Sequence, residues 1–147
     1  MTFTIIPTHW LTHQQPLREI RERVFIQEQH VPSAVEWDDK DETAIHFLVN
    51  TGAGKAIACA RLVVAIHANQ TLLHIGRVAV LAEYRHQGIG RELMAVIISY
   101  CKGEYPSYKI VLHAQTTRQR FYEHLRFVAC GEVFMDAGIP HIEMWLI

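Results

Sequence analysis

Two glycines between two arginines form the segment of this chain that is best suited to bind an anion. Residues 84–93 read Tyr-Arg-His-Gln-Gly-Ile-Gly-Arg-Glu-Leu, so Arg85 and Arg91 flank Gly88 and Gly90. The first amides of a helix have no partner within the helix, and the start of a helix carries partial positive charge. If a helix begins here, the glycines let a phosphate approach these amides closely. The sequence therefore predicts a phosphate-binding loop.

A strand before this loop and a helix after it are both indicated by the sequence. Residues 72–80 are mostly apolar, which is typical of a buried strand. Apolar residues recur at helical spacing over residues 89–102, and Lys102-Gly103 indicates the end of that helix. The loop is not a P-loop, because Arg91-Glu92 stands where that motif needs lysine and a hydroxyl residue. It also lacks the third glycine of a dinucleotide fingerprint.

Length and charge restrict the class of protein. A chain of 147 residues suits one domain, residues 1–147, whose core needs neither disulfides nor a metal. The formal net charge of −1 argues against broad binding to nucleic acid or to an anionic membrane. We see no secretory signal and no apolar run of the ~20 residues that cross a membrane. A cytoplasmic location is therefore expected.

The three cysteines are expected to be free thiols. Cys59, Cys101 and Cys130 are odd in number, widely spaced and surrounded by apolar residues. We expect them to be buried and reduced.

The predicted elements alternate around one sheet. Pro7 is expected to interrupt the first strand, and Pro16 suits the first turn of a helix that ends near residues 31–33. Thr116 and Gln119 match a capping box for a helix at about residues 117–125. The predicted strands are residues 2–6, 44–50, 55–66, 72–80, 108–113, 127–134 and 139–147. This order indicates a mixed α/β (α+β) fold.

The glycine loop resembles the acetyl-coenzyme A pyrophosphate loop of the GCN5-related N-acetyltransferases, the GNAT superfamily. The matching pattern is Arg85, two residues of any type, Gly88, one residue of any type and Gly90. Residues 23–32, His46 and residues 138–141 further resemble the ElaA/YjcF-type bacterial subgroup. The resemblance implies a GNAT-like acyl-CoA N-acyltransferase fold, with a mostly antiparallel sheet, one parallel pair of splayed strands and flanking helices.

The same resemblance implies acetyl-coenzyme A as co-substrate and no metal. In the family, the pantetheine arm lies between the two splayed strands and bonds to the backbone of the strand before the glycine loop. An extended arm with two amides pairs well with an exposed strand edge. The cofactor-binding residues implied for the arm are Val78, Ala79 and Val80, and those implied for the pyrophosphate are Arg85, His86, Gln87, Gly88, Ile89, Gly90 and Arg91.

Gln115 and Tyr122 match a second feature of the family, an asparagine seven residues before a tyrosine, with glutamine in place of asparagine. The resemblance implies that Gln115 bonds to the cofactor arm and that the Tyr122 hydroxyl protonates the departing thiolate. A phenol with a pKa near ~10 is a proton donor at neutral pH. The alternative is that Tyr122 only packs in the core. Arg126 replaces a glycine usual in the family, so the turn there is expected to differ.

His74 is the predicted general base, because it lies on the strand before the loop and an imidazole pKa near ~6.5 suits the task. Glu28, His46 and His113 are the alternatives. The acidic residues 36–42 are expected to form a solvated loop, with attraction of a cationic amine as the other reading.

The sequence thus favours an acetyl-coenzyme A-dependent N-acetyltransferase in which a primary amine attacks the thioester directly in a ternary complex. One alternative is a non-catalytic acyl-CoA-binding sensor or scaffold, and another is a domain that binds a different phosphate ligand. The acceptor, a small-molecule amine or a peptide, and a homodimer are left open.

Overall fold

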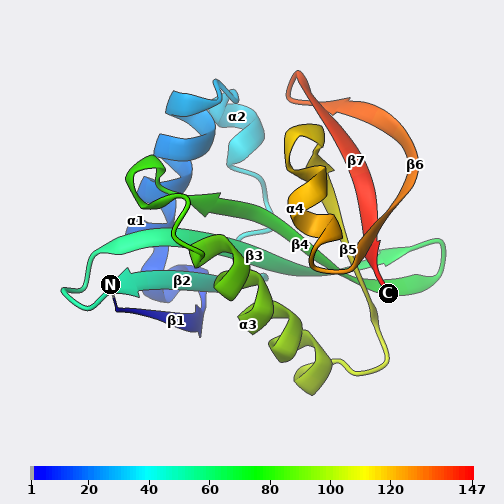
Figure 1. Ribbon diagram of the computed structural model, residues 1–147, viewed down its shortest axis with the longest axis horizontal. Helices are drawn as coiled ribbons and strands as arrows, with labels where there is room; N and C mark the ends of the chain where they lie inside the picture. Colours follow the sequence, from blue (N-terminus) through cyan, green and yellow to red (C-terminus); the bar gives the residue numbers. More distant parts are fainter. Residues whose placement is uncertain (1) are drawn as a thin grey trace.

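Seven strands form one mixed sheet in a computed structural model that describes residues 2–147 (Figure 1). The order across the sheet is β1-β2-β3-β4-β5-β7-β6, and every neighbouring pair is antiparallel except the parallel pair β4 and β5. The strands are β1 (Phe3–Thr8), β2 (Ile45–Thr51), β3 (Ala56–His67), β4 (Gln70–Val80), β5 (Lys109–Gln115), β6 (Phe127–Asp136) and β7 (Ile139–Leu146). The predicted mixed sheet with one parallel pair is confirmed.

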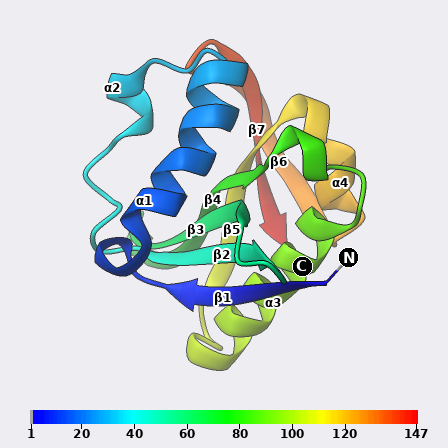
Figure 2. The same ribbon diagram turned by 90° about the vertical axis from the view of Figure 1, so that its left-hand side faces the viewer.

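Helices cover both faces of this sheet. They are α1 (Trp10–Arg21), the π-helix η1 (Glu22–Glu28), α2 (Ser33–Glu36), the 3-10 helix η2 (Ala82–Tyr84), α3 (Ile89–Glu104), the 3-10 helix η3 (Thr116–Arg118) and α4 (Gln119–Glu123). Figure 2 shows α1 and α2 on one side of the sheet, with α3 and α4 on the other. The chain order of strands and helices is the predicted one.

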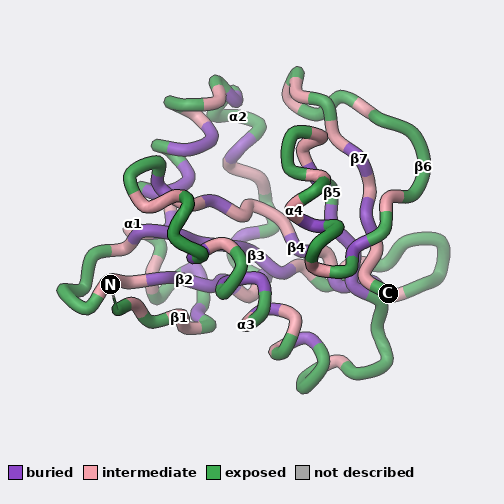
Figure 3. The backbone as a smooth tube through the Cα atoms, in the orientation of Figure 1, coloured by how far each residue is buried: buried purple, intermediate pink, exposed green. Residues whose placement is uncertain are grey.

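Alternation along the strands builds a core on each face. On β2, Phe47 and Val49 pack in the cluster that includes α3, whereas Leu48 packs against α1. Ile89 and Leu93 of α3 are buried at its first turns. Figure 3 shows buried stretches on the central strands, the longest of them in the first half of β3. The start of α3 is therefore fixed against the sheet by its own apolar side, which holds the preceding loop in place.

A bulge in β4 accompanies its separation from β5. The two strands pair only from Leu72 to Ile75 on β4. On the opposite edge, Gly76 pairs with Arg61 and Ala79 with Cys59, so two residues of β4 face one of β3. Within the bulge, Arg77 has a left-handed backbone with φ +52°. Because bulges bend and twist a strand, the C-terminal end of β4 turns away from β5 and leaves a splayed pair.

The prediction for Pro7 is wrong, whereas the prediction for Pro16 agrees with the structure. Pro7 does not interrupt the first strand, because it pairs with Phe47 and β1 extends to Thr8. β1 is an edge strand, where a proline can turn its missing N–H toward solvent. Pro16 agrees with the prediction, since α1 is broken at His13 (φ −129°, ψ 33°) and Pro16 lies in the first turn after the break.

Two predicted helix ends also require correction. The helix after the glycine loop continues through Gly103 to Glu104. The predicted capping box is absent, because no side chain caps η3 or α4. The Gln119 amide that Thr116 was expected to satisfy bonds instead to the Thr116 carbonyl oxygen in a 3-10 turn, and α4 is shorter than predicted.

The cysteines are only partly as predicted. Cys59 and Cys101 are buried, and burial raises the pKa of their thiols to about 12 and about 11. Cys130 is exposed, contrary to the prediction, because it lies on β6 at the edge of the sheet. Within residues 2–147, no helix is both long enough and apolar enough to cross a membrane.

Candidate active site

A cavity of about 810 Å³ opens where β4 and β5 separate. Its walls come from the end of β4, the glycine loop, the end of β5 and α4, with η1, residues 35–40 and the β6–β7 turn on the remaining sides. The structure thus brings nearly all the predicted site residues to one cavity: His74, Val78, Ala79, Val80, Arg85, His86, Gly88, Ile89, Gly90, Arg91, Gln115 and Tyr122 line it. Gln87 is exposed in the loop and does not line it.

The glycine loop presents a row of free amides. His86 and Gly88 have left-handed backbones, with φ +63° and φ +81°. Among residues 2–147, no acceptor is found for the main-chain N–H groups of residues 86–91, and the first helical bond at this end is from Glu92 to the Gly88 carbonyl oxygen. Successive free amides at a helix start form an anion-binding nest. The geometry at the loop is therefore the one that the sequence predicts for a phosphate site.

Arg85 is not a mobile charge beside this loop. Its guanidinium donates two hydrogen bonds of 2.7 Å to the Glu28 carboxylate and one of 2.9 Å to the Val80 carbonyl oxygen. These bonds tie η1 to the end of β4. They also lower the pKa of Glu28, so this alternative base is made weaker by its own partner.

The strand edge predicted to hold the cofactor arm is open on the side of β5. Val78 and Val80 are half-buried and Ala79 is buried, and all three line the cavity. β5 does not pair with this part of β4. The backbone carbonyl oxygen of Val80, one of the residues implied for the arm, already accepts the bond from Arg85 and has one lone pair left.

Gln115 and Tyr122 face the same cavity from β5 and α4. The Gln115 amide donates a 2.8 Å hydrogen bond to Gln29, which follows η1. Tyr122 is 9 % exposed and packs edge-on against Phe121 and Phe127. Burial raises the pKa of Tyr122 to about 12. Both readings of Tyr122, core packing and a protonated phenol at the cavity, are thus compatible with its place.

The predicted base His74 lines the cavity beside His113, with ring centroids 4.5 Å apart. Burial, followed by the charge of His113, lowers the pKa of His74 to about 4. His74 is therefore neutral at pH 7 and binds a proton weakly, and its role as base stays a prediction.

The other two histidines considered as bases differ in position. His46 lies outside the cavity lining, bonds through Nε2 to the Asp41 carbonyl oxygen and is buried, which lowers its pKa. His113 lines the cavity, and its Nε2 lies 3.2 Å from a carboxylate oxygen of Glu143.

Comparison with known proteins identifies the family. The model of the acetyltransferase (GNAT) domain matches residues 12–147. This chain belongs to the GNAT family. A UPF0039 protein of Schizosaccharomyces pombe is 36% identical over 128 residues, which cover 86% of this chain and 83% of the relative. Escherichia coli ElaA is 31% identical over 129 residues (87% and 83%), and Bacillus subtilis YjcF is 30% identical over 126 residues (85% and 86%).

Solved structures of GNAT proteins have the same fold. The crystal structure of ElaA from Escherichia coli superposes with a TM-score of 0.89 at 27% identity, covering 99% of this chain and 100% of ElaA. An acyl-CoA N-acyltransferase from Pseudomonas aeruginosa superposes with a TM-score of 0.88 at 28% identity, with the same coverage. The predicted GNAT fold and the resemblance to the ElaA/YjcF-type subgroup are confirmed.

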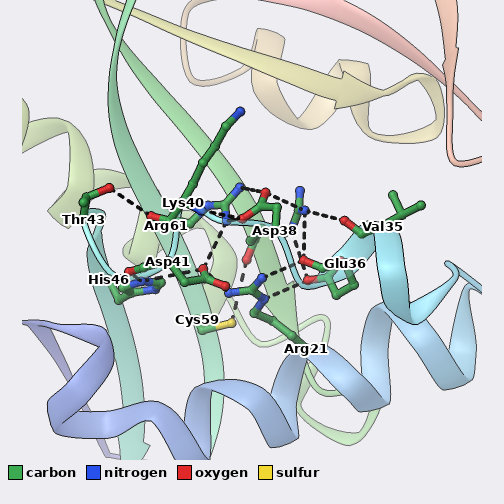
Figure 4. A network of polar contacts seen from close by, with 11 residues as sticks. Arg21, Val35, Glu36, Asp38, Lys40, Asp41, Thr43, His46, Cys59 and Arg61 are labelled. Carbon is green, nitrogen blue, oxygen red and sulfur yellow. Dashed lines mark hydrogen bonds and ion pairs between the residues drawn. The ribbon is translucent and has the colours of Figure 1, made fainter.

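The acidic residues 36–42 of this GNAT protein form a solvated loop only in part, with Asp39, Lys40 and Glu42 exposed. Glu36 and Asp41 are buried, at 2% and 5% exposure, and both bind the guanidinium of the buried Arg21, with ion pairs of 2.8 Å and 2.7 Å (Figure 4). The prediction is wrong for Glu36 and Asp41, because their cationic partner Arg21 comes from an element far away in sequence. A run of acidic residues indicates solvent exposure only where no buried cationic side chain forms ion pairs with it.

These carboxylates belong to a charge-balanced group that we name the ionic cluster. It consists of Arg21, Glu36, Asp38, Asp41, Arg61 and Arg77. Arg61 of β3 bonds to Asp38 at 2.8 Å and to Asp41 at 3.1 Å. Arg77, at the bulge of β4, lies 3.1 Å from Glu36 and 3.3 Å from Asp38. The cluster connects α1 and residues 36–41 to β3 and β4.

Several cavity residues were not identified from the sequence. Glu36, Asp38, Arg61 and Arg77 form one wall, and His141 lines the cavity from β7. The cluster could not be found from spacing, because each arginine lies 15 or more residues from the carboxylates that it binds. For His141 two signals were available: the turn at residues 137–138, which places the histidine near the start of the last strand, and the resemblance of residues 138–141 to the ElaA/YjcF-type subgroup.

Proposed function

We propose that this protein is an acetyl-coenzyme A-dependent N-acetyltransferase, in which a primary amine attacks the thioester directly in a ternary complex. The observation that carries the proposal is one cavity that joins the free amides of residues 86–91, the open edge of β4 and the Tyr122 side chain. Acetyl transfer from coenzyme A requires an anion site for the pyrophosphate, a strand edge for the pantetheine arm and a proton donor for the departing thiolate.

A bound cofactor in a related fold supports the choice of acetyl-coenzyme A. Arabidopsis thaliana NAA60, whose crystal structure holds acetyl-CoA, superposes on 98% of this chain with a TM-score of 0.74. At 14% identity this likeness concerns the fold alone. The free amides of residues 86–91 carry the inference to this chain.

The residues of this protein have two tasks in the proposed reaction, which are to transfer protons and to orient the cofactor. The acceptor must lose a proton before its nitrogen attacks, and the departing thiolate must gain one. Tyr122 suits the second task, because its raised pKa of about 12 keeps the phenol protonated at pH 7. The amides of the loop orient the cofactor by holding its pyrophosphate.

Thiol release from acetyl-coenzyme A in the presence of amines tests the proposal. We would assay the full chain with spermidine, glucosamine, kanamycin and a short peptide with a free N-terminus. Thiol release that depends on one of these amines is the expected result. Tight binding of coenzyme A without release for any amine would instead favour the acyl-CoA sensor or scaffold. Absence of coenzyme A binding would leave a site for a different phosphate ligand.

A further inference from the structure

His141 lines the cavity, with one ring nitrogen fixed by a hydrogen bond and the other accessible to solvent. Nδ1 lies 2.7 Å from the carbonyl oxygen of Ile139, and because a carbonyl oxygen can only accept, Nδ1 carries the proton. In the neutral ring, Nε2 then holds the free electron pair. Within residues 2–147, the buried side-chain N and O atoms that make no hydrogen bond are Nε of Arg61 and Nε of Arg77, the second of which still forms the 3.1 Å ion pair with Glu36. The unpartnered Nε2 of His141 is therefore accessible to solvent.

The fold holds this imidazole where β5 ends. β7 pairs His141 with Gln115, the last residue of β5 and a predicted contact of the cofactor arm. Phe134 of β6 stacks on the ring, with centroids 5.9 Å apart and planes at 27°. The hydrogen bond to Ile139 and the stacked Phe134 fix the ring from two directions. A base held in this way needs no reorientation before it accepts a proton.

The other basic side chains of the cavity are less suited to the task. Glu28 is bound by Arg85, and His113 has its Nε2 directed at Glu143. Burial keeps His74 from holding a proton at pH 7. Among the titratable and charged groups of the packed elements, His74 on β4, His113 on β5, Asp136 at the end of β6, and Asp38 and Lys40 before β2 line the same cavity as His141, and Glu143 on β7 contacts His113.

We propose that His141 is the general base that takes the proton from the acceptor amine, an inference that rests on the proposed acetyl transfer. Nε2 takes one proton from the acceptor ammonium, and the freed electron pair attacks the thioester carbonyl carbon. The C–N bond forms and the C–S bond breaks. The sulfur takes the phenolic proton of Tyr122. The second proton of the amine nitrogen then restores the Tyr122 phenol. His141 releases to solvent the proton that its Nε2 accepted.

The test compares the pH dependence of kcat/KM for wild type, His141→Gln, His113→Gln and the control His124→Gln. His124 is an exposed histidine after α4 that does not line the cavity. The assay uses acetyl-coenzyme A and the amine panel above, with acetyl-coenzyme A affinity and melting temperature measured for each variant. We expect His141→Gln to lower kcat/KM at pH 7 by ~10²–10⁴ and to remove the acid limb of the profile that the enzyme base produces. Affinity for acetyl-coenzyme A should be unchanged, and His124→Gln should match wild type.

Three results would overturn the assignment. A wild-type profile in His141→Gln would exclude His141, and loss of the acid limb in His113→Gln alone would assign the base to His113. Imidazole ¹⁵N spectra that place the His141 proton on Nε2 would contradict the tautomer. A wild-type protein that releases no thiol with any amine would contradict the proposed function as well, which separates that failure from a failure of His141 alone.

Discussion

At the scale of the residue, burial decides what Tyr122 can do. A side chain with 9% exposure and a pKa raised to about 12 holds its proton throughout the neutral range. Such a phenol can protonate a thiolate but cannot serve as a base at pH 7. The same physical effect acts in the opposite direction on His74, whose pKa burial lowers to about 4.

Tyr122→Phe should lower kcat by up to ~10²–10⁴ while the affinity for acetyl-coenzyme A stays the same. Phenylalanine keeps the edge-on packing against Phe121 and Phe127 and loses only the proton donor. Steady-state kinetics and calorimetric titration measure the two quantities, with Tyr108→Phe at an exposed site as the control. An unchanged kcat would leave Tyr122 with a packing role alone.

Asp38 should make stability depend on pH in the acid range. Burial alone would raise its pKa, but the hydrogen bonds from Arg61 and the Lys40 amide, with the charges of Arg61 and Arg77, outweigh burial and lower the pKa from 3.8 to about 2. A carboxylate whose folded pKa is depressed stabilises the protein above its unfolded pKa and loses this effect as pH falls toward the folded one. The contribution of Asp38 is therefore complete at neutral pH and is lost between 3.8 and about 2.

Urea unfolding of wild type and Asp38→Asn across this range measures the effect. The difference in the free energy of unfolding should be constant from pH 7 to about 5 and should shrink below pH 4. Asp39→Asn, at the exposed neighbouring position, is the control. A difference that does not shrink in acid would show that the Asp38 charge contributes nothing.

At the scale of the element, the loop between β4 and α3 depends on its backbone. Gly88 has φ +81°, and a Cβ added there would meet no atom within 4 Å, so a side chain strains the backbone without a clash. Gly54, in the turn between β2 and β3, has φ +87° and the same free space. The two glycines thus form a matched pair, one at the proposed pyrophosphate site and one remote from it.

Gly88→Val should weaken acetyl-coenzyme A binding more than ~10-fold, because a shifted backbone misdirects the free amides. Gly54→Val should carry a similar strain of ~1–3 kcal/mol and leave binding intact. Calorimetric titration measures the affinities for acetyl-coenzyme A, and thermal melts measure the loss of stability that the backbone strain causes. Equal affinity in both variants would contradict the assignment of the loop.

Arg21→Ala should destabilise the protein by ~3–5 kcal/mol, because it removes the most buried cation of the ionic cluster and leaves Glu36 and Asp41 with only Arg77 and Arg61 to offset three buried or half-buried carboxylates. The matched control is Arg23→Ala, two residues away on the next helical segment. Its pair with Glu83 is about half-exposed, with side-chain exposures of 46% and 45%, and should contribute ~0–1 kcal/mol. Urea unfolding of both variants measures the difference, and equal losses would mean that the ionic cluster does not brace α1 against the sheet.

At the scale of the whole molecule, the sequence predicts what depends on near neighbours. The free amides between β4 and α3 follow from Gly88, Gly90 and the helix that they precede, and the order of the elements follows from periodicity. The bulge at Arg77 and the burial of Glu36 could not be predicted, because both depend on partners distant in the chain. The candidate base His141 is likewise defined by Phe134 and Gln115 on neighbouring strands.

The proposed function of the cavity is the transfer of an acetyl group from the thioester to an amine. Acetyl-coenzyme A carrying a ¹³C-labelled acetyl group, incubated with the amine panel, tests this directly. Mass spectrometry of the products should find labelled acetylated amine and free coenzyme A in equal amounts with wild type, and neither with Gly88→Val at the same cofactor concentration. Coenzyme A bound by wild type with no labelled amine formed from any acceptor would contradict the account.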